Sequence, residues 1–341
     1  MNTMPQLSPD TQAILLLCGR LGLRGGNAAA PLEVREYNQV ARWLHDHGLR
    51  PGDLLHGVRE RLLYTEADLP FDAGRLRSLL DRGSALALSV ERWTSAGIWV
   101  LSRGDEDYPE RLKRVLGKVA PPLLYGAGDR SLLVTEGLAI VGSRDVDDDG
   151  AAFARAVARS CARNGITVIS GGARGVDSAA LDAALDSGGK AIAVLPGGLR
   201  RAISGELRSA IESEQLVIIS PYDPDAGFSV GNAMGRNKVI YALSLWAVVV
   251  SSAAESGGTW AGAVENLRRW GIPLFVRNEA GVPQGNQQLI ARGGSPLTRE
   301  DIEATNLRER LAAIAPERDA PPPSAGSSAS PPGQLSLFGD S

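Results

Sequence analysis

The stretch Leu138-Ala139-Ile140-Val141-Gly142-Ser143-Arg144 decides the fold, because four apolar residues run straight into a glycine turn. An apolar run without polar alternation indicates a strand buried on both faces, and such strands form parallel sheets covered by helices. Further runs of this kind lie at 166–169, 191–195, 216–219, 246–250 and 273–276. Alanine-rich stretches between them, such as 150–164 and 258–270, are expected to be helices. The sequence therefore predicts an α/β fold with a Rossmann-like, doubly wound parallel sheet.

The rest of the chain of 341 residues surrounds this core. Before it, apolar positions recur at spacings of three and four, which predicts a small N-terminal helical domain. After it, Pro, Ser, Ala and Gly dominate, which predicts a flexible linker and a disordered C-terminal tail. The expected parts are a helical module at 1–95, a lead-in at 96–136, the core at 137–314, the linker at 315–333 and a terminal peptide at 334–338.

Composition and charge exclude several classes of protein. With 43% hydrophobic residues and a net charge of -3, any nucleic-acid site must be a local concentration of Arg and Lys. Two cysteines cannot form a disulfide framework or a zinc site alone, and all three histidines lie in one short N-terminal stretch. We therefore expect no metal and no cofactor. No signal peptide or membrane-spanning run is recognisable, so we expect a cytoplasmic protein without a membrane partner.

Glycine-rich loops follow four of the predicted strands, at the edge where open parallel sheets bind ligands. Glycine lets backbone N–H groups approach an anion, and the following helix adds its positive N-terminal end. The sequence therefore predicts a phosphate-binding site, although these glycines could also merely turn the chain from strand to helix. The candidate residues are Gly142, Ser143, Arg144, Gly171, Gly172, Arg174, Gly175, Gly197, Gly198, Ser256, Gly257, Gly258 and Thr259. Arg236 and Lys238 precede the strand at 246–250 and are expected to reach the same cleft.

Familiar motifs do not identify the phosphate compound. The chain has neither a G-x-G-x-x-G fingerprint with a following acidic residue nor a Walker A sequence. The stretch at 227–231 matches the G-x-S-x-G nucleophile elbow, but no strand leads into it and no histidine follows it. We interpret that match as chance and expect no catalytic residue there.

Several of these motifs together resemble the DprA/Smf family of bacterial DNA-processing proteins, from about Gly97 to about Gly294. The most specific is SGGARGVD at 170–177, which is similar to the family's S-G-x-A-R-G-[IV]-D signature. AIVGSR at 139–144 is similar to its first Rossmann turn, and RNKVI at 236–240 to its R-N-R-I-I motif. The segments at 108–112, 121–126 and 285–290 resemble its lead-in and its late motif.

The resemblance implies a homodimeric, non-enzymatic protein that binds single-stranded DNA. Such proteins shield incoming strands and help to load RecA during natural transformation. Carried over by motif, the residues that line the DNA-phosphate cleft are Gly142, Ser143, Arg144, Gly171, Arg174, Gly175, Arg236, Asn237 and Lys238. Bases usually stack on aromatic side chains, for which Tyr222 and Phe228 are the candidates.

The chain also departs from the family pattern. Ala179, Ala180 and Leu181 stand where the family usually has a histidine, and 196–203 replaces its G-C-G-L-D-x-x-Y-P stretch. The C-terminal winged helix of many members is not recognisable. Four aspartates crowd Arg144, which is expected to weaken phosphate affinity; they are Asp145, Asp147, Asp148 and Asp149. These departures indicate a divergent branch.

Two other functions fit the glycine loops. Residues 196–198 and 256–265 resemble the LOG-like, lysine-decarboxylase-like enzymes that hydrolyse nucleoside monophosphates, with Glu255 or Glu265 as acid or base. The P-G-G-x-G-T order of those enzymes is split between two loops here, which argues against this hypothesis. The remaining alternative is a nucleotide-binding module without catalysis.

The terminal peptide Gln334-Leu335-Ser336-Leu337-Phe338 places three large apolar residues in a polar tail. It resembles the Q-L-[SD]-L-F peptide by which bacterial polymerases and repair proteins bind the sliding clamp. Leu and Phe would fill an apolar pocket while Gln supplies directed hydrogen bonds. The alternatives are that the peptide docks on its own domain or that the match is chance. We expect the clamp as a partner.

Overall fold

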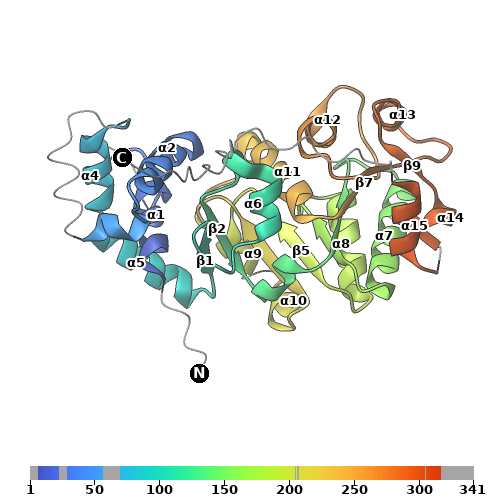
Figure 1. Cartoon of the computed structure of the whole chain (residues 1–341). Coiled ribbons are helices and arrows are strands. Elements are labelled where there is room, and N and C mark those ends of the chain that lie inside the picture. The colour runs from blue at the N-terminus through green and yellow to red at the C-terminus, as the bar shows by residue number, and fades with distance from the viewer. Residues whose placement is uncertain are drawn as a thin grey trace, which may run out of the picture.

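The computed structural model describes residues 7–22, 29–56, 70–203, 205, 207–303 and 305–315. The clamp-binding-like peptide at 334–338 and nearly all of the predicted linker lie outside these residues. The described residues form an α/β protein whose sheet lies between two layers of helices (Figure 1). None of their helices combines the length and the apolar composition that crossing a bilayer requires.

The sheet has nine strands in the order β1-β2-β6-β5-β4-β3-β7-β8-β9. The strands from β6 to β9 in this order run parallel, whereas β1 and β2 are antiparallel to their neighbours. Their bounds are β1 Trp99–Ser102, β2 Leu123–Ala127, β3 Gly137–Val141, β4 Thr167–Ser170, β5 Ala191–Val194, β6 Leu216–Ser220, β7 Trp246–Val249, β8 Leu274–Arg277 and β9 Ser295–Leu297.

All six strands that the apolar runs predict are present as β3 to β8. The other three were missed. β1 and β2 form an antiparallel pair in the lead-in, and β9 is a three-residue edge strand that contains Pro296. Proline is confined to edges in sheets because it cannot donate to the ladder, so β9 lacks an ordinary strand signature.

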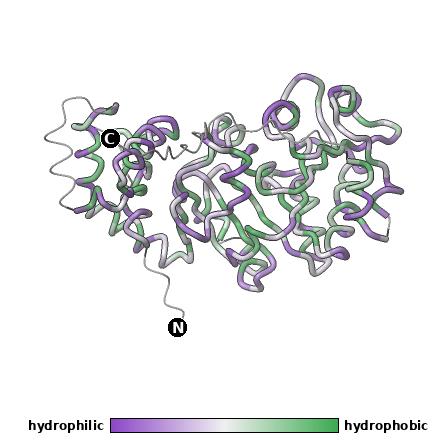
Figure 2. The backbone as a smooth tube through the Cα atoms, in the orientation of Figure 1, coloured by the Kyte–Doolittle hydropathy of each residue, from purple (hydrophilic) through white to green (hydrophobic). Residues whose placement is uncertain are grey.

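Alternate residues of each central strand enter two separate hydrophobic cores. In β3, Leu138 and Ile140 join one core, whereas Ala139 and Val141 join the other. The first core is covered by α7 Asp148–Arg163 and α8 Val176–Asp186, and the second by α11 Val230–Leu243. In Figure 2 the central strands are largely hydrophobic, while hydrophilic residues recur on the surrounding helices. Helices on both faces of a parallel sheet confirm the predicted doubly wound, Rossmann-like fold.

The remaining helices complete these two layers. Short helices lie beside β2, β5 and β6, and the last two follow β9 at one end of the molecule (Figure 1). They are α6 Glu110–Leu116, η2 Gly117–Val119, η3 Arg130–Val134, α9 Leu199–Ile203, α10 Arg208–Glu212, α12 Gly257–Glu265, η4 Asn266–Trp270, α13 Gln284–Ala291, α14 Arg299–Glu303 and α15 Leu307–Ile314. The predicted helix at 258–270 is thus an α-helix that continues as a π-helical turn, η4.

The predicted N-terminal helical domain is present and packs against the antiparallel end of the sheet (Figure 1). Thr11 donates a hydrogen bond to Ser102 of β1 at 2.8 Å, and Trp93 packs edge-on against Tyr125 of β2 at 5.2 Å. The first core therefore runs without a break from this domain into the sheet. Its elements are α1 Pro9–Cys18, α2 Val34–Asp46, η1 Pro51–Leu55, α4 Ala73–Leu80 and α5 Gly83–Ser95.

Candidate phosphate-binding cleft

A cleft of about 350 Å³ opens beyond the carboxyl ends of β3 and β7. From β3 the chain builds the sheet outward through β4, β5 and β6, and then returns to place β7 on the other side of β3. This is the topological switch point, the position at which open α/β sheets bind ligands. The predicted residues that line the cleft are Gly142, Ser143, Arg144, Arg236, Asn237, Ser256, Gly257, Gly258 and Thr259.

Arg236 of α11 forms the inner end of the cleft and is only 5% exposed. Among the described residues, neither Nε nor Nη1 of its guanidinium has a hydrogen-bond partner. Its nearest counter-charge is Asp177 of α8, with 4.0 Å between Nη2 and the carboxylate Oδ2. Burial lowers the pKa of Arg236, and the Asp177 carboxylate opposes that shift. A buried cation with so few partners is a site that an anion would complete.

Gly171, in the loop after β4, leaves the space that the guanidinium of Arg236 occupies. A Cβ atom on this glycine would lie 1.8 Å from Nη1 and 2.3 Å from Nη2 of the guanidinium. Real Cβ atoms do not approach other atoms so closely, so only glycine allows the loop to pack on the guanidinium. Gly171 does not itself line the cleft; it acts through Arg236.

Asp177 lies beside Arg236 and is only 6% exposed. Burial raises the pKa of this carboxyl to about 6, against the lowering effect of Arg236 and of backbone donors at Ala173 and Gly171. The neighbouring Tyr241 is 2% exposed, and in the described part of the chain its hydroxyl has no hydrogen-bond partner. Burial raises the pKa of Tyr241, which therefore stays a neutral O–H donor.

The N-terminus of α12 forms the opposite wall of the cleft. The side chain of its N-cap residue, Ser256, makes no capping hydrogen bond within the described structure. Asn237 of α11 donates to the carbonyl oxygen of Gly258 at 3.1 Å and so fixes this loop against α11. The first-turn amides of α12, together with the positive end of its dipole, are suited to an anion in the cleft.

The rim combines a cation with an exposed aromatic ring. The Arg144 guanidinium lies 5.6 Å from the centre of the Phe228 ring, which is 61% exposed. Val230 and Met234, at the start of α11, are also exposed and line the cleft. The other aromatic candidate, Tyr222, contacts α11 at Gly235, where a Cβ would lie 2.4 Å from the tyrosine hydroxyl. Phe228 is therefore the better placed of the two for stacking on a base.

The other predicted site residues lie around the cleft rather than in its lining. Gly175 has φ +85°, and a Cβ there would lie 2.5 Å from the carbonyl oxygen of Ser143, so it joins two of the loops. Gly172, Gly197 and Gly198 also have positive φ and belong to the turns after β4 and β5. Lys238 is half-buried on α11; burial lowers its pKa while Glu265 opposes that shift. In the structure these glycines turn the chain at the ends of strands, which is the alternative to phosphate binding.

The aspartates that crowd Arg144 mostly have other partners. Asp145, which lines the cleft, forms an exposed ion pair at 2.5 Å with the predicted phosphate ligand Arg174, which does not line it. Asp147 accepts a hydrogen bond from the backbone N–H of Gly150 at 2.7 Å and caps α7. Asp148 and Asp149 lie in the first turn of that helix, where negative charge is favourable.

Three functional candidates were missed from the sequence. Asp177 closes the SGGARGVD motif, which is the one signal that could have identified it. Tyr241 carries no sequence signal that separates it from a core tyrosine. Asn286 accepts from the backbone N–H of Ser252 at 2.9 Å and donates to the carbonyl oxygens of Val250 and Arg277. It thereby braces the loop after β7 that leads to α12.

The carboxylates that a hydrolase would need lie elsewhere. Glu265 is at the end of α12 and pairs with Arg269 at 3.4 Å. Glu255 is exposed and lies 3.7 Å from Arg292. Neither residue is among the described residues that line the cleft. The stretch at 227–231 begins α11, where Ser229 caps the helix by accepting from the backbone N–H of Asn232, which agrees with a chance motif match.

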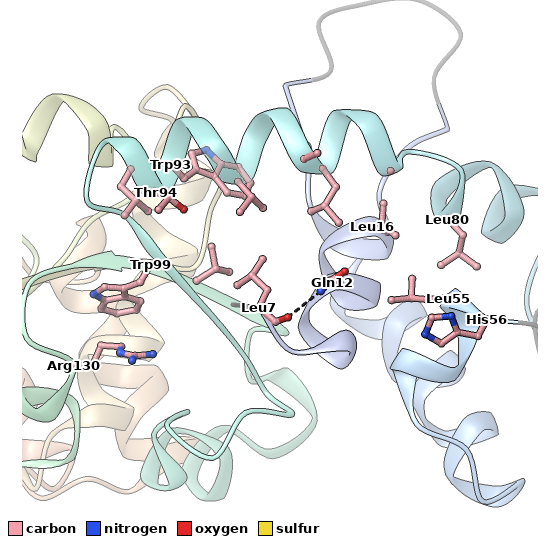
Figure 3. Close-up of a pocket in the computed structure, with 16 residues that line it drawn as sticks. Leu7, Gln12, Leu16, Leu55, His56, Leu80, Trp93, Thr94, Trp99 and Arg130 are labelled. Atoms are coloured by element: carbon pink, nitrogen blue, oxygen red, sulfur yellow. Dashed lines mark hydrogen bonds between the residues drawn. The ribbon is translucent and has the colours of Figure 1, made fainter. Parts of the chain in front are cut away.

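A larger hollow of about 600 Å³ lies between the N-terminal helices and β1 (Figure 3). Leucine and tryptophan side chains dominate its lining, including Leu16, Leu80, Trp93 and Trp99. Its one arginine, Arg130, already lies 3.2 Å from Asp107. Because the switch-point cleft combines a buried guanidinium with a helix N-terminus, it is the better candidate for phosphate.

Fold and cleft together define a doubly wound α/β protein whose sheet has, at its switch point, a cleft that holds Arg144 and Arg236. The chain belongs to the family described as DNA recombination-mediator protein A, which matches residues 99–306. The resemblance to DprA/Smf proteins is thereby confirmed. The matched region includes every residue that lines the cleft.

Curated relatives agree with this assignment. The chain is similar to DNA processing protein DprA of Streptococcus pneumoniae, with 32% identity over 200 residues, 57% of this chain and 69% of the relative. It is 31% identical to protein Smf of Escherichia coli over 194 residues, 55% of this chain and 51% of the relative. For protein Smf of Synechocystis the identity is 31% over 163 residues, 46% of this chain and 40% of the relative. The match thus spans about half the length of the two Smf proteins.

Two solved structures resemble the chain. The X-ray structure of DprA from Streptococcus pneumoniae has a TM-score of 0.67 at 20% identity, covering 92% of this chain and 100% of that one. At this identity the likeness concerns the fold. A structure of DNA processing protein A from Helicobacter pylori has a TM-score of 0.51 at 25% identity, covering 64% and 95%. The Helicobacter structure describes the single-stranded DNA binding mode of that protein.

Proposed function

We propose that this chain is a single-stranded DNA-binding protein of DNA processing and recombination, and not an enzyme. The observation that carries the proposal is Arg236, a nearly buried guanidinium that lines the switch-point cleft with two nitrogens lacking partners within the described structure. The single-stranded DNA binding of the Helicobacter pylori relative supports the same reading.

DNA phosphates would be held by three kinds of group. Arg236 supplies a charge in a low-dielectric position, where electrostatic attraction is strongest. The α12 amides supply backbone donors, and Arg144 supplies a solvent-exposed charge at the rim. Phe228 offers the face on which a base stacks, a contact that every base can make. These contacts favour binding without sequence preference.

The finer biological role is also part of the proposal. A protein that covers strands in this way would protect them and could deliver them to RecA, in transformation or in another recombination process. We further propose that it acts as a homodimer, as the family resemblance implies. Protection of strands and their delivery to RecA both depend on DNA binding by the cleft.

Oligo-dT binding tests the proposed function. Anisotropy of a labelled oligonucleotide is expected to report binding at low salt that weakens as salt rises, because phosphate contacts release counterions. The Arg144→Ala variant should bind more weakly and lose about one unit of the log–log salt slope. Its matched control is Arg159→Ala, which removes an exposed arginine of α7 away from the cleft.

The outcomes separate clearly. A wild-type protein that binds no oligo-dT at low salt would overturn the proposed function. An equal loss in the Arg144 and Arg159 variants would mean that general surface charge, and not the cleft, binds the DNA.

We also propose that the peptide Gln334-Leu335-Ser336-Leu337-Phe338 tethers the protein to the bacterial sliding clamp. Its support is the sequence pattern alone, since the peptide lies outside the described residues. A short peptide with apolar anchors must be ordered when it binds, which gives modest affinity suited to transient recruitment. The tether would bring the DNA cleft to sites of replication or repair.

Deleting residues 334–338 is expected to abolish clamp binding and to leave oligo-dT binding unchanged, because the peptide and the cleft are separate in sequence. Surface plasmon resonance on immobilised clamp would measure the first effect and anisotropy the second. A matched control replaces only Ser336 with aspartate, which keeps the Q-L-[SD]-L-F pattern and should keep the affinity. Clamp binding that survives the deletion would refute the tether.

A further inference from the structure

We propose that the inner end of the cleft binds a phosphate monoester, so that the protein holds DNA by a phosphorylated strand end. This inference rests on the proposed function, but it is more specific, because internal phosphates of a strand are diesters. A free mononucleotide presents the same monoester chemistry, and the experiment below distinguishes the two sources.

The first argument is a shortage of acceptors at the inner end of the cleft. Arg236 contributes Nε and Nη1, and Tyr241 contributes its hydroxyl, as buried donors without partners among the described residues. Two carboxylates, Asp145 and Asp177, line the cleft, and Asp177 lies 4.0 Å from Arg236. Three unsatisfied donors in a protein interior are unfavourable, since each loses its hydration. A ligand with several acceptor oxygens would correct this.

The second argument is charge. A phosphate monoester carries three terminal oxygens and a charge near -2, whereas a diester carries two and a charge of -1. The guanidinium of Arg236 and the N-terminus of α12 face the same small volume from two walls. In such a poorly solvated site the attraction grows with ligand charge. Asp145 and Asp177 also line the cleft and oppose this attraction, so the monoester is favoured where it lies against Arg236 and the α12 amides.

The third argument is shape. Arg236, Asp177 and Tyr241 close the inner end, at exposures of 5%, 6% and 2%. An internal phosphate carries a nucleoside on each side, so reaching this end would require two chains to enter side by side. A volume of about 350 Å³ is at the small end of ligand sites and therefore favours the entry of one nucleoside over two. A terminal phosphate is attached to only one nucleoside, so only one chain must leave the cleft.

The cleft opens at the rim, where the other two groups proposed to bind DNA lie. Phe228, 61% exposed, and the Arg144 guanidinium 5.6 Å from its ring centre lie at this opening. With the terminal phosphate at Arg236, the first nucleoside is directed toward the rim, where a base can stack and the next phosphate can meet Arg144. The strand end is thereby bound at two points, its terminal phosphate at Arg236 and its next phosphate at Arg144.

The experiment compares labelled oligo-dT carrying a 5′-phosphate, a 3′-phosphate or neither, by anisotropy on the full chain. A phosphorylated end is expected to tighten binding by about 10-fold or more, because it adds charge-assisted hydrogen bonds. The preference should disappear in Arg236→Met and persist in Arg159→Ala. Thymidine monophosphate and thymidine serve as competitors, of which only the monophosphate should displace the labelled strand.

Each outcome decides between the ideas. Equal affinity for all three oligonucleotides overturns the monoester inference and leaves the proposed function intact. Displacement by thymidine as readily as by its monophosphate also overturns it. Binding of thymidine monophosphate, measured directly by isothermal titration calorimetry, without binding of any oligonucleotide supports monoester chemistry from a free nucleotide and overturns the proposed function. The comparison of oligonucleotides uses the wild-type chain, so it holds even if Arg236→Met fails to fold.

Discussion

Replacing Gly171 with alanine is expected to lower the free energy of unfolding by about 1–3 kcal/mol and to remove most of the affinity for DNA. The new Cβ would lie 1.8 Å from Nη1 of Arg236 and 2.4 Å from Cζ, which no rotation of the methyl group can relieve. Either the guanidinium must leave its position or the loop after β4 must move. Urea denaturation and oligonucleotide anisotropy would measure the two effects.

Two controls isolate the clash. Gly83→Ala adds a methyl group in the first turn of α5, where nothing in the described structure lies within 4 Å of the new atom. It should leave unfolding and DNA binding near wild-type values. In the double variant Gly171→Ala with Arg236→Ala, the clash has no partner, so the two destabilising effects should not add. An unchanged urea midpoint in Gly171→Ala would contradict the packing described for Arg236.

Arg236→Met is expected to weaken binding of phosphorylated strands by about 10- to 100-fold, the effect of losing one or two charged hydrogen bonds. Methionine keeps an unbranched side chain and removes the charge. Asp177 then loses the group that lowers its pKa, so that pKa should rise above the value of about 6 that burial gives it beside Arg236. The stability of the variant should therefore depend strongly on pH.

The direction of this dependence follows from proton binding. The folded carboxyl has a raised pKa, whereas the unfolded carboxyl titrates near its ordinary value of 3.8, so the folded state holds a proton that the unfolded state releases. Stability should fall as pH rises from about 4 through the folded pKa and then level off. In the wild type this window ends near pH 6; in the variant it should extend higher.

Urea midpoints between pH 4 and pH 8 would measure this change. Adding Asp177→Asn to Arg236→Met should flatten the profile, because the titrating group is gone. A profile of Arg236→Met that matches the wild type would show that Asp177 does not respond to Arg236.

Much of the core could be predicted from sequence because buried parallel strands leave an unmistakable pattern. The runs from 138 to 276 are short segments made almost entirely of apolar residues, and all became strands of the doubly wound sheet. The loops after β3 and β7 could also be assigned to one cleft, since neighbouring parallel strands end at the same edge. Their shared location follows from topology alone.

The missing parts depend on contacts that one-dimensional patterns do not contain. β1 and β2 pair antiparallel within the lead-in, and their place at the sheet edge depends on packing with the N-terminal domain. The burial of Arg236 depends on Gly171, a residue 65 positions earlier in the numbering. Arg174 looked like a phosphate ligand until the structure paired it with Asp145.

The return of the chain from β6 to β7 has a consequence for how the protein is made. During synthesis, the loop after β3 and the Gly171 loop emerge first, yet the cleft has no inner cation until α11 follows and no second wall until α12 follows. No nascent chain or proteolytic fragment that ends before residue 259 holds a complete site. The phosphate binding that we propose for the cleft would therefore require the finished core.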